Sequence, residues 1–236
     1  MVADRSTAAL DAALDRLRAP TTAEDRFRIL QQLVEYWHGP IGPQDAMNTG
    51  DLAHVRLPQP LRSWFLWAGN RPEIMSGQNF LLSPEQIRME DDHLLFYIEN
   101  QGVYRWATLP EGSDPPVFGR YNDGEPWQLE DVSLSEHLIL ACLFESIMGA
   151  PYGASNAWIK QDTLFQITNA LQPLAIATWR WPGATRFYAR NGVFMYAAQN
   201  EIAGEIGHSV WIGAKTQAPL AFLKPHIDDK WEYVAL

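Results

Sequence analysis

The pair Asn191-Gly192 constrains the fold more than any other feature of the sequence. Asn-Gly is the preferred pair for the type I′ turn of a two-residue β-hairpin, because both turn residues take positive φ angles. Residues 186–190 before the pair and 193–197 after it read as strands. The pair therefore predicts a hairpin, and with it a sheet that contains antiparallel strands.

Helical patterns open the chain. A first helix begins at Ser6 or Thr7 and ends before Pro20, and Thr21 with Glu24 has the capping-box spacing for a second helix that ends at Gly39. These two helices are expected to form an antiparallel hairpin. Apolar residues at helical spacing predict three more helices, over 57–69, 133–149 and 162–171.

Strand patterns fill most of the remaining chain. They cover 80–82, 93–99, 103–109, 117–121, a short piece at 127–129, 174–181, 209–214 and 231–234, and Thr216 is expected to cap a short helix through Leu223. Residues 39–56 and 150–158 read as loops. The expected fold class is α+β: a twisted, mostly antiparallel sheet with packed helices and an N-terminal helical hairpin.

Length and composition bound the organisation. A chain of 236 residues fits one large domain or two small ones. We predict a single domain over 1–236, with a helical extension at 1–38 and a β-rich part at 150–236; a split near 150 is the alternative. The one cysteine, Cys142, excludes an intramolecular disulfide, and residues 1–18 lack the apolar run of a signal peptide, which predicts a cytoplasmic protein.

The formal charge of −10 opposes binding to nucleic acid phosphates and favours an encounter with a basic protein. Solubility alone also explains an acidic surface. No run of apolar residues is long enough for a membrane helix.

A series of short motifs resembles the SUKH superfamily, the Smi/Knr-like bacterial immunity proteins. The segment from Leu57-Pro58 to Gly69 is similar to the entry motif of that family, and further matches follow in the family's order at 99–103, 114–117, Trp127 and 133–138. The best-matched core spans 57–149, and 210–216 is similar to the closing part of long members. The N-terminal extension lies outside this likeness.

The resemblance implies a SUKH-like α+β fold and a non-enzymatic role in which the protein binds and neutralises a cognate toxin, often a nuclease, of a bacterial polymorphic toxin system. Fungal relatives are regulators, so a regulatory or scaffold protein with several partners is the alternative. A carbohydrate-binding protein or an unrecognised hydrolase comes after these, since the ten tryptophans would suit sugar stacking.

The sequence carries no strong catalytic signature. His-Glu-x-x-His, a phosphate-binding glycine loop and Gly-x-Ser-x-Gly are all missing, and the six histidines lack metal-ligand spacing. Cys142 lies among apolar residues at helical spacing, which is typical of a small core residue. We therefore expect no catalytic residue, no cofactor and no metal site.

The expected partner-binding residues are acidic and aromatic. An acidic cluster precedes one predicted strand, a polar turn follows another, and tryptophan is enriched at the centres of protein interfaces. The candidates are Glu90, Asp91, Asp92, Asp123, Glu125 and Trp127. They would lie at one end of the sheet and meet a basic surface, although polar turn chemistry alone also accounts for the acidic residues.

Overall fold

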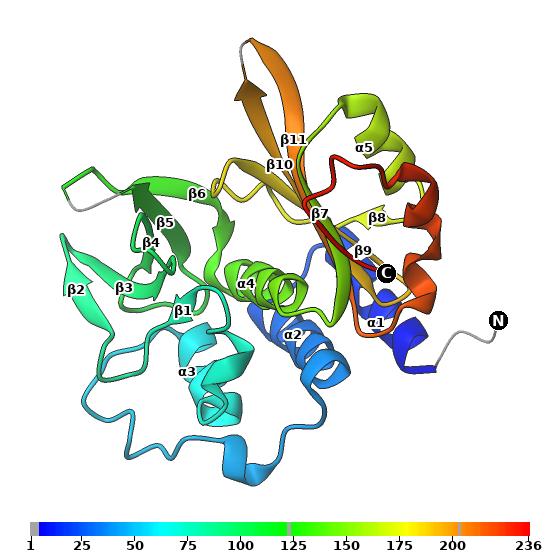
Figure 1. The fold of residues 1–236 in the computed structure, drawn as a ribbon. Helices are drawn as coiled ribbons and strands as arrows, with labels where there is room; N and C mark the ends of the chain where they lie inside the picture. Colours follow the sequence, from blue (N-terminus) through cyan, green and yellow to red (C-terminus); the bar gives the residue numbers. More distant parts are fainter. Residues whose placement is uncertain (1–4, 122–123, 203) are drawn as a thin grey trace. The chain divides into compact units, whose positions relative to one another are not determined.

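A computed structural model describes residues 5–121, 124–202 and 204–236. It has the expected α+β fold, with two N-terminal helices and antiparallel sheets (Figure 1). The chain divides into two compact units, one made of residues 21–145 and the other of residues 1–20 with 146–236. The expectation of a single domain over 1–236 stays a prediction.

The unit of residues 21–145 contains a six-stranded antiparallel sheet in the order β1-β3-β4-β5-β6, with β2 also paired to β3. Its strands are β1 (Phe80–Leu81), β2 (Arg88–Glu90), β3 (His93–Ile98), β4 (Tyr104–Thr108), β5 (Pro116–Tyr121) and β6 (Gln128–Ser133). Its helices are α2 (Ala23–His38), α3 (Gln59–Ala68) and α4 (Leu134–Met148), whose last residues belong to the other unit, and short 3-10 turns lie at Pro43–Asp45 and Pro72–Ile74.

Helix α4 covers one face of this sheet, as the sequence predicted. The imidazole of His137 packs at 5.2 to 5.7 Å between ring centroids against Phe96, Tyr97 and Trp106. All four side chains are buried. The same face accommodates Gly119, where a Cβ atom would collide with the Tyr104 hydroxyl and the Glu130 carboxylate. Aromatic burial on one face thus fixes the sheet to the helix.

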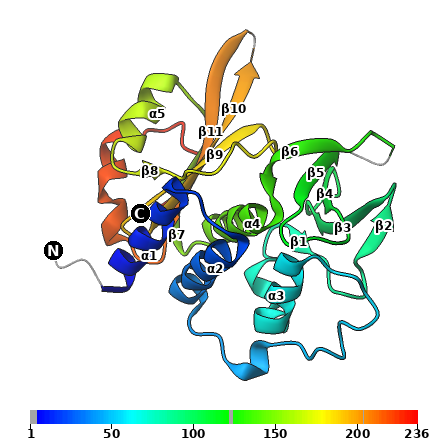
Figure 2. The ribbon, with the colours of Figure 1, turned by 180° about the vertical axis from the view of Figure 1, so that it is seen from behind.

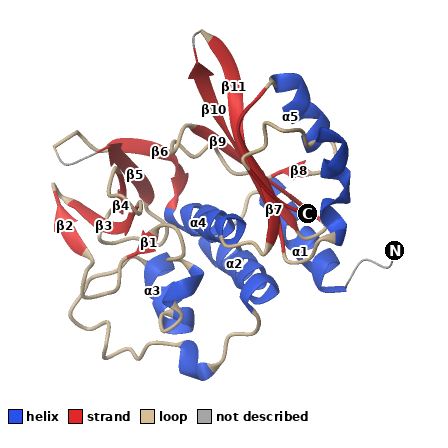
Figure 3. Ribbon diagram, viewed as in Figure 1, coloured by secondary structure: helices blue, strands red, loops and turns tan. Residues whose placement is uncertain are grey.

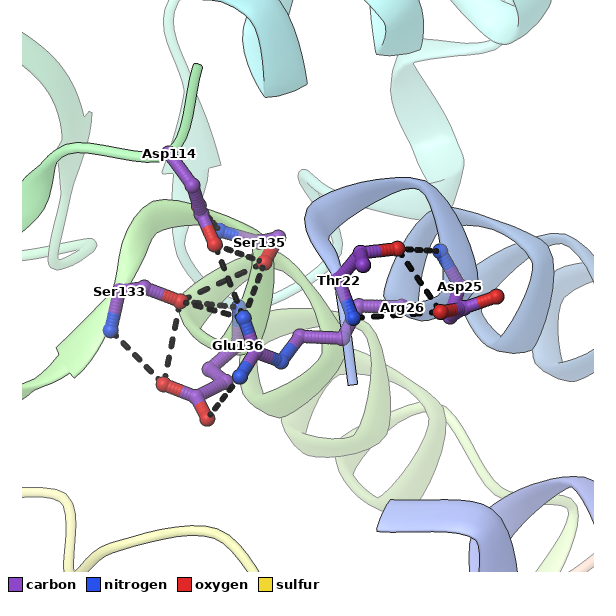
Figure 4. Close-up of polar contacts among 7 residues, drawn as sticks. All are labelled: Thr22, Asp25, Arg26, Asp114, Ser133, Ser135 and Glu136. Atoms are coloured by element: carbon purple, nitrogen blue, oxygen red, sulfur yellow. Dashed lines mark hydrogen bonds and ion pairs between the residues drawn. The ribbon is translucent and has the colours of Figure 1, made fainter. Parts of the chain in front are cut away.

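A polar network joins the starts of α2 and α4 (Figure 4). The guanidinium of Arg26 contacts Asp114 Oδ2 at 2.9 Å and Glu136 Oε1 at 3.1 Å. Asp114 also accepts from the backbone N–H of Ser135, while Ser133 and Glu136 cap α4 as predicted. The network satisfies backbone donors at the start of α4 and ties Arg26 of α2 to that helix start through ion pairs.

The cap of α2 differs from the prediction by one residue. Thr22, not Thr21, accepts from the backbone N–H of Asp25, and the Asp25 carboxylate accepts in return from Thr22 N. Asp25 performs the role assigned to Glu24. An aspartate can complete a capping box as a glutamate does, so the sequence alone did not distinguish the pair Thr21 and Glu24 from the pair Thr22 and Asp25.

The second unit contains another six-stranded antiparallel sheet, in the order β12-β7-β11-β10-β9-β8. Its strands are β7 (Tyr152–Ile159), β8 (Gln172–Pro173), β9 (Ala184–Arg190), β10 (Val193–Ile202), β11 (Glu205–Ala214) and β12 (Tyr233–Ala235). Its helices are α1 (Arg5–Asp15), continued by a 3-10 turn at Arg16–Arg18, α5 (Gln161–Thr168) and the 3-10 helix η4 (Ala218–His226). Figure 2 shows these elements from behind.

The predicted hairpin is present in this second sheet. Asn191 and Gly192 join β9 to β10 with φ angles of 53° and 74°. Inward residues of β10 and β11, such as Met195 and Ile212, form a core with α5, η4 and Trp231. Strands β10 and β11 run on past their neighbours as a two-stranded ribbon (Figure 3). Asp11 of α1 accepts from Asn191 N, which ties α1 to the turn.

Three local predictions in this unit were wrong. Residues 150–158 were expected to form a loop but hold most of β7, a central strand whose small residues alternate too weakly to be recognised. Residues 174–181 were expected to form a strand but make only an isolated bridge at Trp179. Thr216 does not cap η4, which begins with Gln217 as its N-cap. In the first two cases, tertiary pairing and not local preference decides which segment becomes a strand.

In the part of the chain that the structure describes, no helix combines the length and the apolar composition needed to cross a membrane.

Candidate functional site

The β2–β3 hairpin presents two aspartates on a turn of strained geometry. Asp91 and Asp92 form a two-residue connection, with Glu90 paired to His93, and have φ angles of 46° and 64°. This is the backbone of a type I′ turn, for which asparagine and glycine are the least strained residues. Aspartate tolerates the left-handed region at a cost in energy. Aspartate is itself favoured at the first position of this turn, so the strain falls on Asp92, where glycine would fit better.

Arg120 on β5 braces this turn. Its guanidinium donates to Asp91 Oδ2 at 2.7 Å, to Glu90 Oε2 at 2.9 Å and to the backbone carbonyl of Glu125 at 3.3 Å. The Arg120 side chain is only 5% exposed, whereas that of Asp91 is 72% exposed. A nearly buried arginine thus holds one end of a solvent-facing carboxylate and fixes its direction.

Trp127 closes the other side of the guanidinium. The Arg120 guanidinium carbon lies 4.1 Å from the centroid of the Trp127 ring, and Trp127 Nε1 donates to the Glu90 carbonyl at 3.2 Å. His93 packs between this ring and Phe118, at centroid distances of 5.7 and 4.4 Å. Stacking of arginine on tryptophan is favourable when the cation is largely removed from water. We call Glu90, Asp91, Asp92, Arg120, Glu125 and Trp127 the turn cluster.

The turn cluster lies on the sheet face opposite α4. Directly paired residues of antiparallel strands share a face, so Arg120 shares a face with Arg105, and Phe118 with Ala107. Glu90 on this face also accepts from Arg88 at 2.7 Å and from Arg105 at 3.4 Å. Its carboxylate is therefore saturated by three arginines. The carboxylates of Asp92 and Glu125, both exposed, make no ion pair with the described residues.

The net negative charge of the chain comes from the unit that carries this cluster. Residues 21–145 hold 19 of the 28 acidic and 8 of the 18 basic residues, a formal charge of −11, and all eight basic residues are arginines. The other unit holds 9 acidic and 10 basic residues, a formal charge of +1. Solubility alone does not require such segregation.

The structure brings together most of the residues that the sequence singled out. Glu90, Asp91, Glu125 and Trp127 all contact Arg120, and Asp92 lies beside them on the turn. Asp123 lies outside the described residues. The arginine at the centre was missed, as were Arg88, Arg105 and His93. A weak signal existed, because Arg88 and Glu90 have the two-residue spacing that places strand side chains on one face.

Four buried carboxylates of the described residues serve as hydrogen-bond acceptors, and one of them, Asp45, accepts from the backbone N–H of Gly42 at 2.8 Å. Glu145 accepts from the backbone N–H groups of Gln78 and Asn79 and from the Tyr97 hydroxyl, the last at 2.7 Å. Burial raises the pKa of the Glu145 carboxyl, and the donated hydrogen bonds oppose that rise. Glu130 accepts from the Tyr104 hydroxyl, and Glu99 from two backbone N–H groups of the β3–β4 turn. These carboxylates position loops and strands.

The buried histidine and cysteine have packing roles. Burial lowers the pKa of His137 to about 3, so its ring is neutral at physiological pH. Cys142 is fully buried on α4, as predicted for a core residue. Within residues 5–121, 124–202 and 204–236, no three histidine, cysteine or carboxylate side chains are grouped as metal ligands would be.

Two cavities of the described residues are enclosed enough to be candidates for a catalytic site; a third, of about 410 Å³ beside Trp158, Lys160 and Glu205, is a shallow, open hollow. One of about 150 Å³ in the second unit is lined in part by Asp11, Asp15 and Arg18. There Asp15 pairs with Arg18 and Asp11 holds the backbone of Asn191, and burial raises the pKa of Asp11. A cavity of about 360 Å³ in the unit of 21–145 has no ionisable side chain in its wall. Neither brings together free carboxylates or histidines in the way an acid-base pair requires.

Comparison with known proteins gives no family: the chain matches no protein-family model, no curated protein and no solved structure. The resemblance to the SUKH superfamily therefore stays an expectation from the sequence.

Proposed function

We propose that this chain is a non-enzymatic protein-binding module whose turn cluster engages a basic surface of a partner protein. The observation that carries the proposal is the Asp91-Asp92 turn, which keeps two carboxylates in a left-handed conformation and is braced by a buried arginine. Strained backbone persists where the surrounding structure enforces it, and such positions gather at functional sites. The net charge of −11 on this unit has the same sign as the two exposed carboxylates, so the whole unit attracts a positively charged surface.

The geometry suits recognition. Arg120, Trp127 and Glu90 hold one another in place, so little side-chain entropy is lost when a partner docks. Tryptophan is enriched among residues that dominate interface energies, and Trp127 is partly exposed. Exposed carboxylates at the rim speed association with a positively charged surface and exclude acidic ones.

We further propose that the partner is a cognate toxin, which this protein binds and neutralises in the cytoplasm as an immunity protein. The ordered SUKH-like motifs over 57–149 support this identity; the turn cluster lies inside that span, and one of its residues, Trp127, belongs to a matched motif. An acidic surface would cover the basic groove by which a nuclease holds phosphates. A regulatory or scaffold protein would use the same surface for several weaker partners.

The test is an affinity capture of tagged protein from its native cells, followed by titration of the main bound protein at 50 to 500 mM salt. Asp91→Asn with Asp92→Asn should weaken that partner about tenfold at low salt, and less at high salt. The matched control is Asp228→Asn with Asp229→Asn, a second exposed aspartate pair that lies in the other unit.

Each outcome decides between the roles. One tight partner whose toxic activity stops on binding establishes immunity, and several partners of micromolar affinity establish regulation. No partner at all, or equal effects of the two aspartate pairs, would refute the turn cluster as a binding site.

A further inference from the structure

The unit of residues 21–145 contains an apolar cavity that the turn cluster does not use. It has a volume of about 360 Å³ and lies between α3 and the β1 edge of the sheet. Its wall is made largely of aromatic, methionine and aliphatic side chains, among them Met47, Trp64, Phe65, Met75, Phe80 and Ile98. A cavity of this size and composition resembles the smaller binding pockets of proteins, which span about 300 to 1,000 Å³.

The cavity wall is held in place from behind. The loop that ends at Phe80 is anchored by the buried Glu145 carboxylate, which accepts from Gln78 N and Asn79 N. Leu81 N donates to the Ser76 hydroxyl at 3.2 Å and to the Met75 carbonyl at 3.2 Å. Gly69 lies where a Cβ atom would collide with Met47 and Phe65. The cavity is therefore preformed, whereas Met47 and Met75 leave its wall adaptable.

The cavity and the turn cluster share a face of one sheet. Phe80 pairs with Ile98, and Ile98 pairs with Arg105, which contacts Glu90 of the turn cluster. Paired residues lie on the same face, so this row leads from the cavity rim to the cluster. The Phe80 side chain, 44% exposed, is the aromatic at the rim. A partner docked on the turn cluster would thus extend over the cavity.

The rim has the same polarity as the cluster. Pro72 and Gln86 line the cavity, and their neighbours Glu73 and Glu85 expose carboxylates. Arg71 pairs with Glu73, whereas no arginine or lysine of the described residues pairs with Glu85. An apolar hollow edged by carboxylates is complementary to an apolar side chain that has basic neighbours.

We propose that this cavity is an anchor pocket for one aliphatic or aromatic side chain of a basic segment in the partner protein. The inference rests on the proposed function, and it adds the source of specificity. Charge at the turn cluster attracts many basic surfaces, but only a segment with an apolar residue at the right distance fills the pocket. Interfaces commonly derive most of their binding energy from such buried anchors.

The test uses three synthetic heptapeptides as probes: Lys-Lys-Lys-Leu-Lys-Lys-Lys, the same peptide with serine at the centre, and a Glu-flanked leucine peptide. Binding is measured by fluorescence anisotropy, with the chain labelled at its methionine methyl groups for NMR. The leucine peptide should bind about tenfold tighter than the serine peptide, and the Glu-flanked peptide more weakly than both. The methyl signals of Met47 and Met75 should shift, while that of Met195, buried in the other unit, stays unchanged.

Variants separate the two sites. Phe80→Ala should remove most of the preference for leucine over serine, and Phe165→Ala, the matched control at an exposed phenylalanine of α5, should leave it intact. Asp91→Asn with Asp92→Asn should weaken both lysine peptides alike and keep the leucine preference.

Equal affinity for the leucine and serine peptides, or no binding of either, would overturn the anchor pocket, as would methyl shifts that leave out Met47 and Met75. A separate result tests the proposed function. If Phe80→Ala leaves capture of the native partner unchanged while the aspartate variants weaken it, the pocket inference fails and the turn cluster stands.

Discussion

Replacing Arg120 by alanine tests whether the turn cluster is the rigid unit that its geometry indicates. The change removes the stacking on Trp127, worth about 1 kcal/mol for a ring that stays partly exposed to solvent. It also removes a charged hydrogen bond to Glu90. That loss costs only about 1 kcal/mol, because Arg88 and Arg105 still pair with the same carboxylate. The pair with Asp91 adds little, since that carboxylate is 72% exposed and returns to water.

Loss of the packed side-chain stem contributes about 1 kcal/mol more. We therefore expect Arg120→Ala to lower the free energy of unfolding by about 3 kcal/mol. Arg120→Lys keeps the stem and the charge but loses the planar stacking and two of three donated hydrogen bonds, so its cost should be about half as large.

The assay is urea unfolding followed by circular dichroism, together with amide hydrogen exchange of the β2–β3 turn. Arg62→Ala, an exposed arginine of α3 without an ion pair among the described residues, is the control and should change the free energy by less than about 0.5 kcal/mol. A stability of Arg120→Ala within that same range of the parent chain would refute the reasoning, because the cluster would then be an accidental surface arrangement.

Four further predictions follow from individual contacts. Thr22→Ala should lower the free energy of unfolding by about 1 kcal/mol and Thr21→Ala by much less, because Thr22 alone caps α2; urea unfolding distinguishes them. His137 has a folded pKa of about 3 and an unfolded value of 6.5, so the unfolded state binds more protons in that window. Stability should fall as pH drops below 6.5, by at most about 2 kcal/mol at pH 5, and His137→Phe should remove that dependence. The pKa of Glu145 is raised in the folded state, so its contribution to stability is complete below pH 4.5 and is lost as pH rises through the folded pKa. In Glu145→Gln the pH profile of stability should lack this loss. The variant should also be less stable overall by about 2 kcal/mol, because a buried donor loses its acceptor. Asp92→Gly should raise thermal stability by up to about 1 kcal/mol by relieving the positive φ angle and should also weaken the partner, whereas a loss of stability would show that the aspartate is needed for the turn itself.

The predicted turn at Asn191-Gly192 was confirmed, whereas the loop predicted over residues 150–158 was wrong. The turn pair determines its own backbone, since few other residues take two positive φ angles in succession. Strand β7 has no such local signal: its small residues become a strand because β11 and β12 supply hydrogen bonds on both sides. Central strands of this kind depend on partners far away in sequence.

The turn cluster shows the same division. Sequence identified Glu90, Asp91, Asp92, Glu125 and Trp127 by residue type and by the turns they accompany. Arg120 was missed because its role depends on strand pairing, which brings β5 beside β4 and sets Arg120 opposite Arg105. Before pairing is known, an arginine in a strand pattern reads as one more exposed charge.

Caps, turn pairs and periodicity act within a few residues, so the α+β class, the positions of most helices, the Asn-Gly hairpin and the acidic candidates could be predicted from local patterns. The division of the strands into two sheets, and the cluster in which Arg120 joins two turns beside an apolar cavity, became visible only in the folded chain. Those features arise from contacts between residues distant along the chain, whose energies depend on burial and register that no local pattern encodes.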